Sequence, residues 1–249
     1  MSSNLDLAVI GGTGLYRLAN LEQPDSIERD TPYGAPSGPV RIGVLNGKRV
    51  AFLARHGESH SIPPHRINYR ANLWLLKSLG AARVLAINAV GGVGEGCGPR
   101  ALVLPDQLID YTWGRIATLC EEPGTEVLHV DLTDPYCPAL RAEILDAARR
   151  LGIGLRDGGC LGITQGPRLE TRAEVRKLAR DGCDLIGMTG MPEAALAREL
   201  GLRYACLAMV ANWAAGLDPD DREITLAEIE GHLAAATQPL PELIARLLA

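Results

Sequence analysis

The sequence lacks a basic excess, a long apolar run and a paired-cysteine motif, and each absence excludes a class of protein. Its 249 residues carry a formal net charge of −5, whereas proteins with a general nucleic-acid surface usually carry a basic excess that neutralises phosphates. No uncharged apolar run approaches the length that spans a bilayer. The N-terminal stretch MSSNLDLAVIGG has no basic region before its glycines, so we expect no signal peptide and a cytoplasmic protein without nucleic-acid or membrane partners.

Motifs for metals and nucleotides are also missing. The six cysteines include no C-x-x-C pair, which excludes the common zinc and redox motifs and favours reduced thiols. No Lys follows the first glycine turn, as a Walker loop would require, and there is no H-E-x-x-H pair for zinc. Any bound anion must therefore be held by a local site of another kind.

What the sequence does contain is an alternation of short apolar runs with segments of helical periodicity. The apolar runs predict strands over residues 5–10, 40–45, 49–54, 84–90, 161–165 and 185–189, a strand pair around Pro105 within residues 102–111, and a strand in the stretch 205–216. Helical spacing covers residues 68–79 and 138–151, and further helices are expected before residue 180, after Pro192 and on both sides of Pro239. Asn46-Gly47 predicts a hairpin between two of the strands. We expect one α/β domain over residues 1–249, built on a mixed β-sheet flanked by helices.

The stretch from Ala205 to Gly216, ACLAMVANWAAG, runs from apolar residues to one amide, Asn212, and then breaks into small residues. It predicts a buried strand that delivers a polar group to a pocket at its carboxyl end. A planar amide offers a donor and an acceptor, which suits the edge of a heterocyclic base. The alternative is that Asn212 caps the next helix or satisfies its own turn, the commoner task for an Asn leaving a strand.

Two further stretches favour an anion site. GGTG at residues 11–14 follows the first predicted strand, and its free N–H groups suit an anion, although a plain strand-to-helix turn explains it equally well. Arg55 and His56 follow another strand; Arg is a planar clamp for phosphate, and a neighbouring His can donate to the same oxyanion. Zinc binding by His56, His60 and His65 is an alternative that lacks an acidic partner, and a surface loop with incidental histidines is another.

The blocks GGTG, ARHG, NAVGG, GPRLET, GMTGMPE and AMVAN occur in this order along nearly the whole chain. Together they resemble the trimeric nucleoside phosphorylase family, which includes purine nucleoside phosphorylases and methylthioadenosine phosphorylases. The resemblance implies a homotrimer that needs no metal or organic cofactor. It also implies phosphorolysis, in which a purine nucleoside and inorganic phosphate give the free base and a ribose 1-phosphate.

The resemblance implies roles for individual residues as well. Phosphate would be bound by Thr13, Arg55, His56, Asn88, Ala89 and Thr189. Met188 would lie against the ribose, and the base would meet Val90, Gly91, Leu169, Asn212, Trp213 and Ala214. Leu169 departs from the family, which usually offers a stacking Phe there, and Trp213 is bulkier than expected beside the base.

Two positions would select the base. Methylthioadenosine phosphorylases carry two acids, in T-D-Y-D, after the last strand, where this chain has Asn212 and Ala214. An Asn can accept from N7–H and donate to a 6-carbonyl, which suits hypoxanthine or guanine. Glu170 stands where 6-oxopurine phosphorylases have a Glu that accepts from N1–H, a hydrogen that adenine lacks. The alternative for Glu170 is a first-turn acid favoured by the helix dipole.

The sugar end resembles the methylthio enzymes instead. Ordinary 6-oxopurine phosphorylases place a His in the last helix to meet the 5′-hydroxyl, where this chain has Leu226 and Ile229. An apolar wall suits a methylthio group and leaves a hydroxyl unpaired, at a cost of about 1–3 kcal/mol. His129 resembles a residue that reaches this pocket from the adjacent subunit. A purely structural burial of the Leu226 and Ile229 stripe is the alternative.

Combining both ends predicts phosphorolysis of S-methyl-5′-thioinosine to hypoxanthine and 5-methylthioribose 1-phosphate, with Asn212, Glu170 and His56 as catalytic residues. A general inosine and guanosine phosphorylase is the first alternative, and a methylthioadenosine phosphorylase is the second. A purine-binding module without catalysis is the alternative from another class, and phosphate-dependent release of base separates it from an enzyme.

Overall fold

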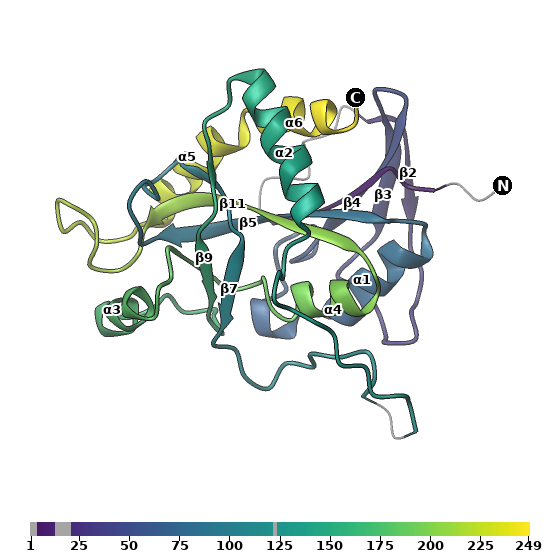
Figure 1. Cartoon of the computed structure of the whole chain (residues 1–249), viewed down its shortest axis with the longest axis horizontal. Coiled ribbons are helices and arrows are strands. Elements are labelled where there is room, and N and C mark those ends of the chain that lie inside the picture. The colour runs from purple at the N-terminus through teal and green to yellow at the C-terminus, as the bar shows by residue number, and fades with distance from the viewer. Residues whose placement is uncertain (1–3, 13–20, 122–123) are drawn as a thin grey trace.

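A branched sheet of 11 strands forms the centre of this computed structural model, which describes residues 4–12, 21–121 and 124–249 (Figure 1). The strands are β1 (Leu7–Gly11), β2 (Glu22–Ile27), β3 (Val40–Leu45), β4 (Lys48–Ala54), β5 (Arg83–Gly92), β6 (Leu102–Leu104), β7 (Gln107–Asp110), β8 (Leu155–Asp157), β9 (Cys160–Ile163), β10 (Leu185–Gly187) and β11 (Arg203–Trp213). The helices are α1 (Tyr69–Ser78), α2 (Pro138–Leu151), α3 (Arg172–Arg180), α4 (Glu193–Glu199), α5 (Leu226–Thr237) and α6 (Leu240–Leu247), with a short 3-10 helix at Pro64–Arg66.

Strand β5 is the hub of the sheet. It pairs in parallel with β1 and β11 and antiparallel with β10 through Gly91 and Gly92. Because β4 also runs parallel to β1, the carboxyl ends of four strands meet at one edge, where ligands usually bind in such sheets. The antiparallel members β2 and β3 extend the other side. The expected α/β fold with a mixed sheet and flanking helices is confirmed.

Helices cover both faces of the sheet. Figure 1 shows α2, α5 and α6 on one face, with α1 and α4 on the other. Along β11, Ala205, Leu207 and Met209 join the core beneath α2 and α6, whereas Cys206 and Ala208 join the core beneath α1 and α4. A strand that is buried on both faces needs a nearly continuous apolar run. This explains why the central strands could be predicted from the sequence as apolar runs.

The hairpin expected at Asn46-Gly47 joins β3 to β4. Both residues have positive φ, 52° and 73°, as a two-residue type I′ turn requires. The pairing of Leu45 with Lys48 closes the turn. Strand β2, with sequence EQPDSI, was not expected because it is polar and contains Pro24. It pairs only with β3 among the described strands, and an edge position tolerates a proline that cannot donate to the ladder.

Candidate active site

A cavity of about 640 Å³ opens at the edge where the carboxyl ends of β1, β4, β5 and β11 meet. The segments after β9 and β10 and one face of α5 complete its wall. Most of the residues predicted for the site line this one cavity: Arg55, His56, Ala89, Val90, Gly91, Leu169, Glu170, Met188, Thr189, Asn212, Ala214 and Ile229. Segments far apart in the sequence therefore converge as the order of the motifs suggested.

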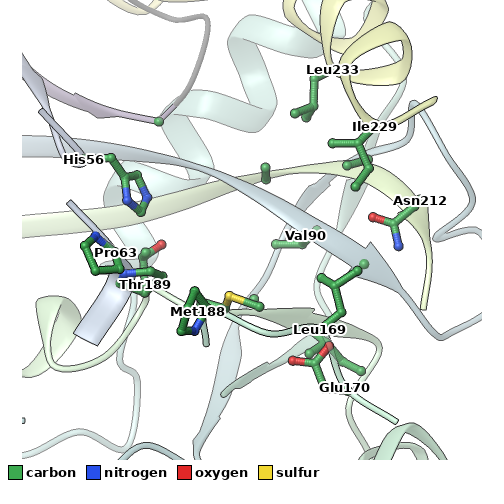
Figure 2. Close-up of a pocket in the computed structure, with 18 of the residues that line it drawn as sticks. His56, Pro63, Val90, Leu169, Glu170, Met188, Thr189, Asn212, Ile229 and Leu233 are labelled. Atoms are coloured by element: carbon green, nitrogen blue, oxygen red, sulfur yellow. The ribbon is translucent and has the colours of Figure 1, made fainter. Parts of the chain in front are cut away.

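The cavity has two chemically different ends, joined by apolar walls. In Figure 2, His56 and Thr189 lie at one end, and Asn212 and Glu170 lie at the other. Ile229 of α5 lies near Asn212, on the opposite side of the cavity from Glu170. The residues predicted to bind an anion and the residues predicted to read a base therefore lie at separate ends of the cavity.

Arg55 is buried, with only 1% of its surface exposed, and forms a two-pronged ion pair with Glu193. Its Nε and Nη2 atoms donate to the carboxylate at 2.8 Å each, and Nη1 donates to the carbonyl of Ile87 at 3.1 Å. Burial lowers the pKa of Arg55, but Glu193 outweighs burial, so the pKa lies above its ordinary value. The hydroxyl of Tyr204 also donates to Glu193 at 2.8 Å. The guanidinium is thus charged and rigidly held at the cavity wall.

His56 is held in one tautomer. Its Nδ1 lies 2.8 Å from the carbonyl oxygen of Ile62, which can only accept, so Nδ1 carries the hydrogen. Burial lowers the pKa of His56 to about 4, against the hydrogen bond to Ile62, and the charges of Arg55 and His60 lower it further. At neutral pH the ring is therefore uncharged, and its Nε2 is an acceptor rather than the donor that the sequence suggested.

A β-bulge sets the direction of Asn212. Val210 pairs with Val90 and Asn212 pairs with Gly91, so Ala211 is an extra residue in the β11 ladder. Bulges near binding sites commonly re-aim a side chain. His232 of α5 contacts the Ala211 carbonyl through Nδ1 at 2.8 Å. The Nδ2 of Asn212 donates to the carbonyl of Trp213 at 2.7 Å, so its Oδ1 can still accept from another donor and its second amide hydrogen can still donate to another acceptor.

Glu170 is the acidic group that lines the cavity at the same end as Asn212. The hydroxyl of Thr164 donates to its Oε1 at 2.5 Å, which orients the carboxylate and leaves Oε2 available. The residue lies just before the capping box of α3, in which Thr171 accepts from the Glu174 N–H. The helix-dipole alternative for Glu170 is therefore weaker, because Glu174 is the acid that serves the first turn.

The apolar wall of α5 differs from the expected one by a single helical turn. Ile229 and Leu233 line the cavity, whereas Leu226 is 78% exposed and lies outside its wall. Residues at i and i+4 share a helix face, so Leu233 was detectable from the same spacing that singled out Leu226. Ile224, just before the helix, also lines the cavity.

Several other predicted residues lie away from the cavity surface, and one cannot be placed. Asn88 is buried in β5, and neither of its amide atoms has a hydrogen-bond partner. The Trp213 ring packs against Gly98, where an added Cβ would approach it to 3.0 Å, and its carbonyl accepts from the Asn212 amide. His129 is exposed in the long segment between β7 and α2. Thr13 lies outside the described residues.

The most important residue missed from the sequence is Glu193. A buried arginine implies a nearby acid, but the sequence did not indicate an acid 138 positions away. Pro63, Pro64 and His60 also line the cavity, and only their place after Arg55 and His56 hinted at this. Within the described part of the chain, no group of three or more His, Cys, Asp or Glu side chains could hold a metal ion, and no helix could cross a membrane.

Comparison with known proteins identifies relatives along the whole chain. The family model of the phosphorylase superfamily matches residues 6–249. A "probable S-methyl-5′-thioinosine phosphorylase" of Xanthomonas campestris pv. campestris is 64% identical over 99% of both chains. A "probable 6-oxopurine nucleoside phosphorylase" of Thermococcus kodakarensis is 48% identical, over 86% of this chain and 81% of its own.

A solved structure agrees with these relatives. The methylthioadenosine phosphorylase of Schistosoma mansoni, in complex with adenine, superposes with a TM-score of 0.91. It is 30% identical in sequence, and the match covers 98% of this chain and 91% of that one. With a family match over nearly its full length and the motifs gathered around one cavity, the chain belongs to the phosphorylase superfamily.

Proposed function

We propose that the chain catalyses the phosphorolysis of S-methyl-5′-thioinosine to hypoxanthine and 5-methylthioribose 1-phosphate. One observation carries the proposal: an amide and a carboxylate, Asn212 and Glu170, share a cavity with the apolar side chains of Ile229 and Leu233. The first pair suits a 6-oxopurine and the second pair suits a methylthio group. The name of the Xanthomonas relative supports the same substrate.

The base would be read by donors and acceptors that adenine cannot match. Asn212 Oδ1 would accept from N7–H, and the amide hydrogen not used by the Trp213 carbonyl would donate to O6. Glu170 Oε2 would accept from N1–H, because Oε1 already accepts from Thr164. Adenine presents a bare N1 to a carboxylate, and such a mismatch of buried polar groups is costly.

The proposed phosphate end would bind phosphate through oriented hydrogen-bond donors more than through net positive charge. Glu193 compensates the charge of Arg55, and His56 is neutral at pH 7. A phosphate anion would receive N–H groups of Arg55 and the hydroxyl of Thr189, while a P–OH group could donate to His56 Nε2. Preorganised donors of this kind stabilise charge without reorganisation during the reaction.

The reaction would then follow from geometry. A phosphate oxygen forms the bond to C1′ as the C1′–N9 bond breaks, and the electron pair passes to the purine, which takes up a proton from solvent at N7. Asn212 would hold the N7–H of the departing base, and Glu170 its N1–H. Phosphate is both nucleophile and counter-charge to the ribosyl cation. The chain would need no metal or organic cofactor for these steps.

We also propose a homotrimer, in which His129 of one subunit reaches the sugar end of its neighbour's cavity. The segment between β7 and α2 supports this, because it exposes Trp113, Ile116, Val127 and Leu128, and clustered exposed apolar side chains commonly mark an interface. Leu226, also exposed, would be covered there. Six free cysteines suit the reducing cytoplasm as the working compartment.

A spectrophotometric panel tests the proposed reaction. Methylthioinosine, inosine, guanosine and methylthioadenosine are each incubated with the enzyme, with and without phosphate. We expect base release only with phosphate and the highest kcat/KM for methylthioinosine. A preference for inosine or guanosine would instead support the general 6-oxopurine phosphorylase that the Thermococcus relative suggests. Binding without base release would mark a purine-binding module.

A further inference from the structure

Arg115 joins three parts of the cavity wall although it is not one of the lining residues. It lies in the long segment between β7 and α2, and its side chain is half-buried. Six hydrogen bonds leave its guanidinium group. Because the group has five N–H donors, at least one hydrogen is shared between two acceptors.

One set of bonds holds the base-reading segment. Arg115 Nη2 donates to the carbonyls of Thr164 at 3.3 Å and Gln165 at 2.9 Å, and Nε donates to the Gln165 side chain at 3.2 Å. These two residues begin the loop that leads to Glu170. Thr164 in turn donates its hydroxyl to the Glu170 carboxylate. The position of Glu170 therefore depends on the backbone that Arg115 holds.

The other set holds the segment on the phosphate side. Nη1 donates to the carbonyls of Met188 at 2.8 Å and Met191 at 2.6 Å, which flank Thr189. The same atom contacts the hydroxyl of Tyr69 at 3.2 Å, and that hydroxyl donates to the carbonyl of Pro64, a cavity residue. One side chain thus links the segments that carry Thr189, Glu170 and Pro64.

The character of the acceptors indicates what Arg115 does. All six are neutral oxygens, so the guanidinium does not serve as the counter-ion of a carboxylate in these contacts. A planar fork that bonds carbonyls of two chain segments fixes their separation, which a lysine cannot reproduce. We propose that Arg115 is a positioning residue that sets the spacing between Glu170 and Thr189, and with it the simultaneous binding of base and phosphate. The kinetic part of this inference rests on the proposed function.

The test removes the Arg115 guanidinium group by mutation and then supplies free guanidinium ion in solution. In Arg115→Ala we expect kcat/KM for methylthioinosine to fall by about a hundred-fold, because small misplacements of binding groups are that costly. KM should rise for both nucleoside and phosphate. Millimolar guanidinium chloride should restore part of the activity, whereas the same concentration of sodium chloride should not. Arg115→Lys should stay impaired.

Hydrogen exchange gives a readout that is independent of catalysis. Residues 164–170 and 188–191 should exchange faster in Arg115→Ala, and guanidinium should slow both segments again. The control is Arg141→Ala, since Arg141 of α2 also bonds two backbone carbonyls, those of Leu104 and Pro105 at 3.0 and 3.1 Å, besides its ion pair with Asp157, and is not a cavity residue. It should leave both KM values and both segments unchanged.

Unchanged exchange in the two segments of Arg115→Ala would overturn the proposal. So would wild-type KM values, or a loss of activity that Arg141→Ala reproduces and guanidinium does not rescue. If the wild-type protein releases no base from any nucleoside, the proposed function fails, and the exchange measurement alone still decides whether Arg115 holds the two segments.

Discussion

Asn212 owes its direction to neighbouring backbone atoms rather than to another side chain. The Trp213 carbonyl fixes the amide, and the bulge at Ala211 places it at the end of β11. An Asp at this position would place a carboxylate oxygen next to the Trp213 carbonyl oxygen, where Asn212 places an amide hydrogen. The amide is therefore the group that this backbone accommodates, which is consistent with selection of a 6-oxo base.

Asn212→Asp should exchange one base preference for another. We expect the ratio of kcat/KM for methylthioadenosine to that for methylthioinosine to rise by on the order of ten- to a hundred-fold, because the donor to O6 is lost and an acceptor for a 6-amino group is gained. Asn212→Ala is the control: it also loses the donor to O6 but gains no acceptor, so it should lower kcat/KM for both substrates and raise the ratio less than the Asp variant does. An unchanged ratio in the Asp variant would remove Asn212 from base recognition.

His56 should make stability depend on pH. Its folded pKa of about 4 lies below the ordinary 6.5, so the unfolded chain takes up the proton first as the pH falls. The contribution to the free energy of unfolding is present above pH 6.5 and is lost towards pH 4, by about 1.4 kcal/mol per unit of pKa difference.

His56→Asn removes this titration and retains an N–H donor for the Ile62 carbonyl. Urea unfolding across the window from pH 6.5 to pH 4 should show a shallower loss of stability in the variant than in the wild type. Parallel curves for the two proteins would show that the ring is not buried in its neutral form.

At the scale of elements, two helices begin on opposite sides of the cavity. Helix α3 starts immediately after Glu170, and Thr171 and Glu174 cap each other there. Helix α5 starts at the apolar wall, and Thr225 accepts from the Glu228 N–H. Because both caps are threonines with an acid three residues on, the two helix starts form a matched pair, and under the proposed function they would support different ends of the nucleoside.

Removing either cap should lower the free energy of unfolding by a similar amount, but the two removals should change different substrate preferences. Thr171→Ala and Thr225→Ala should each lower the free energy of unfolding by about 1 kcal/mol. Thr171→Ala should weaken discrimination between methylthioinosine and methylthioadenosine, since the start of α3, which follows Glu170, is no longer capped. Thr225→Ala should weaken discrimination between methylthioinosine and inosine, since the start of α5, between Ile224 and Ile229, is no longer capped. Urea unfolding and the substrate panel measure both effects, and identical specificity changes would contradict this assignment.

At the scale of the whole molecule, one chain leaves the sugar end of the cavity incomplete under the proposed function. Leu226 and the residues around His129 are exposed in the single chain. If a neighbouring subunit covers them, selection of the methylthio group depends on assembly, whereas the Arg55–Glu193 pair at the proposed phosphate end forms within one chain.

Light scattering should give a mass three times the 26.6 kDa of the chain. Val127→Asp places a charge on an exposed apolar residue of the segment between β7 and α2, and it should dissociate the assembly and raise KM for methylthioinosine more than for phosphate. The neutral, similarly sized Val127→Thr should remain assembled. A wild-type monomer with full activity would contradict the trimer.

The sequence by itself determined the central strands of the fold, because strands buried on both faces must be apolar along most of their length. Strands β4, β5 and β11 appear as such runs and end in Arg55, the Asn88 to Gly92 stretch and Asn212. The edge strand β2 contributes little to the core and carried no such signal. Whether residues 1–249 form a single domain and whether a cofactor is needed both remain predictions.

Only the tertiary structure decided which side chains act together. Distances between remote segments decided that Arg55 pairs with Glu193 and that Leu233, rather than Leu226, lines the cavity. They also decided that Arg115 bonds the segments that follow β9 and β10. Local composition and periodicity specify what a segment becomes, since they reflect interactions between neighbours along the chain. Contacts between remote segments follow from how the layers pack, and this packing also placed His56 in a neutral form that its sequence context did not indicate.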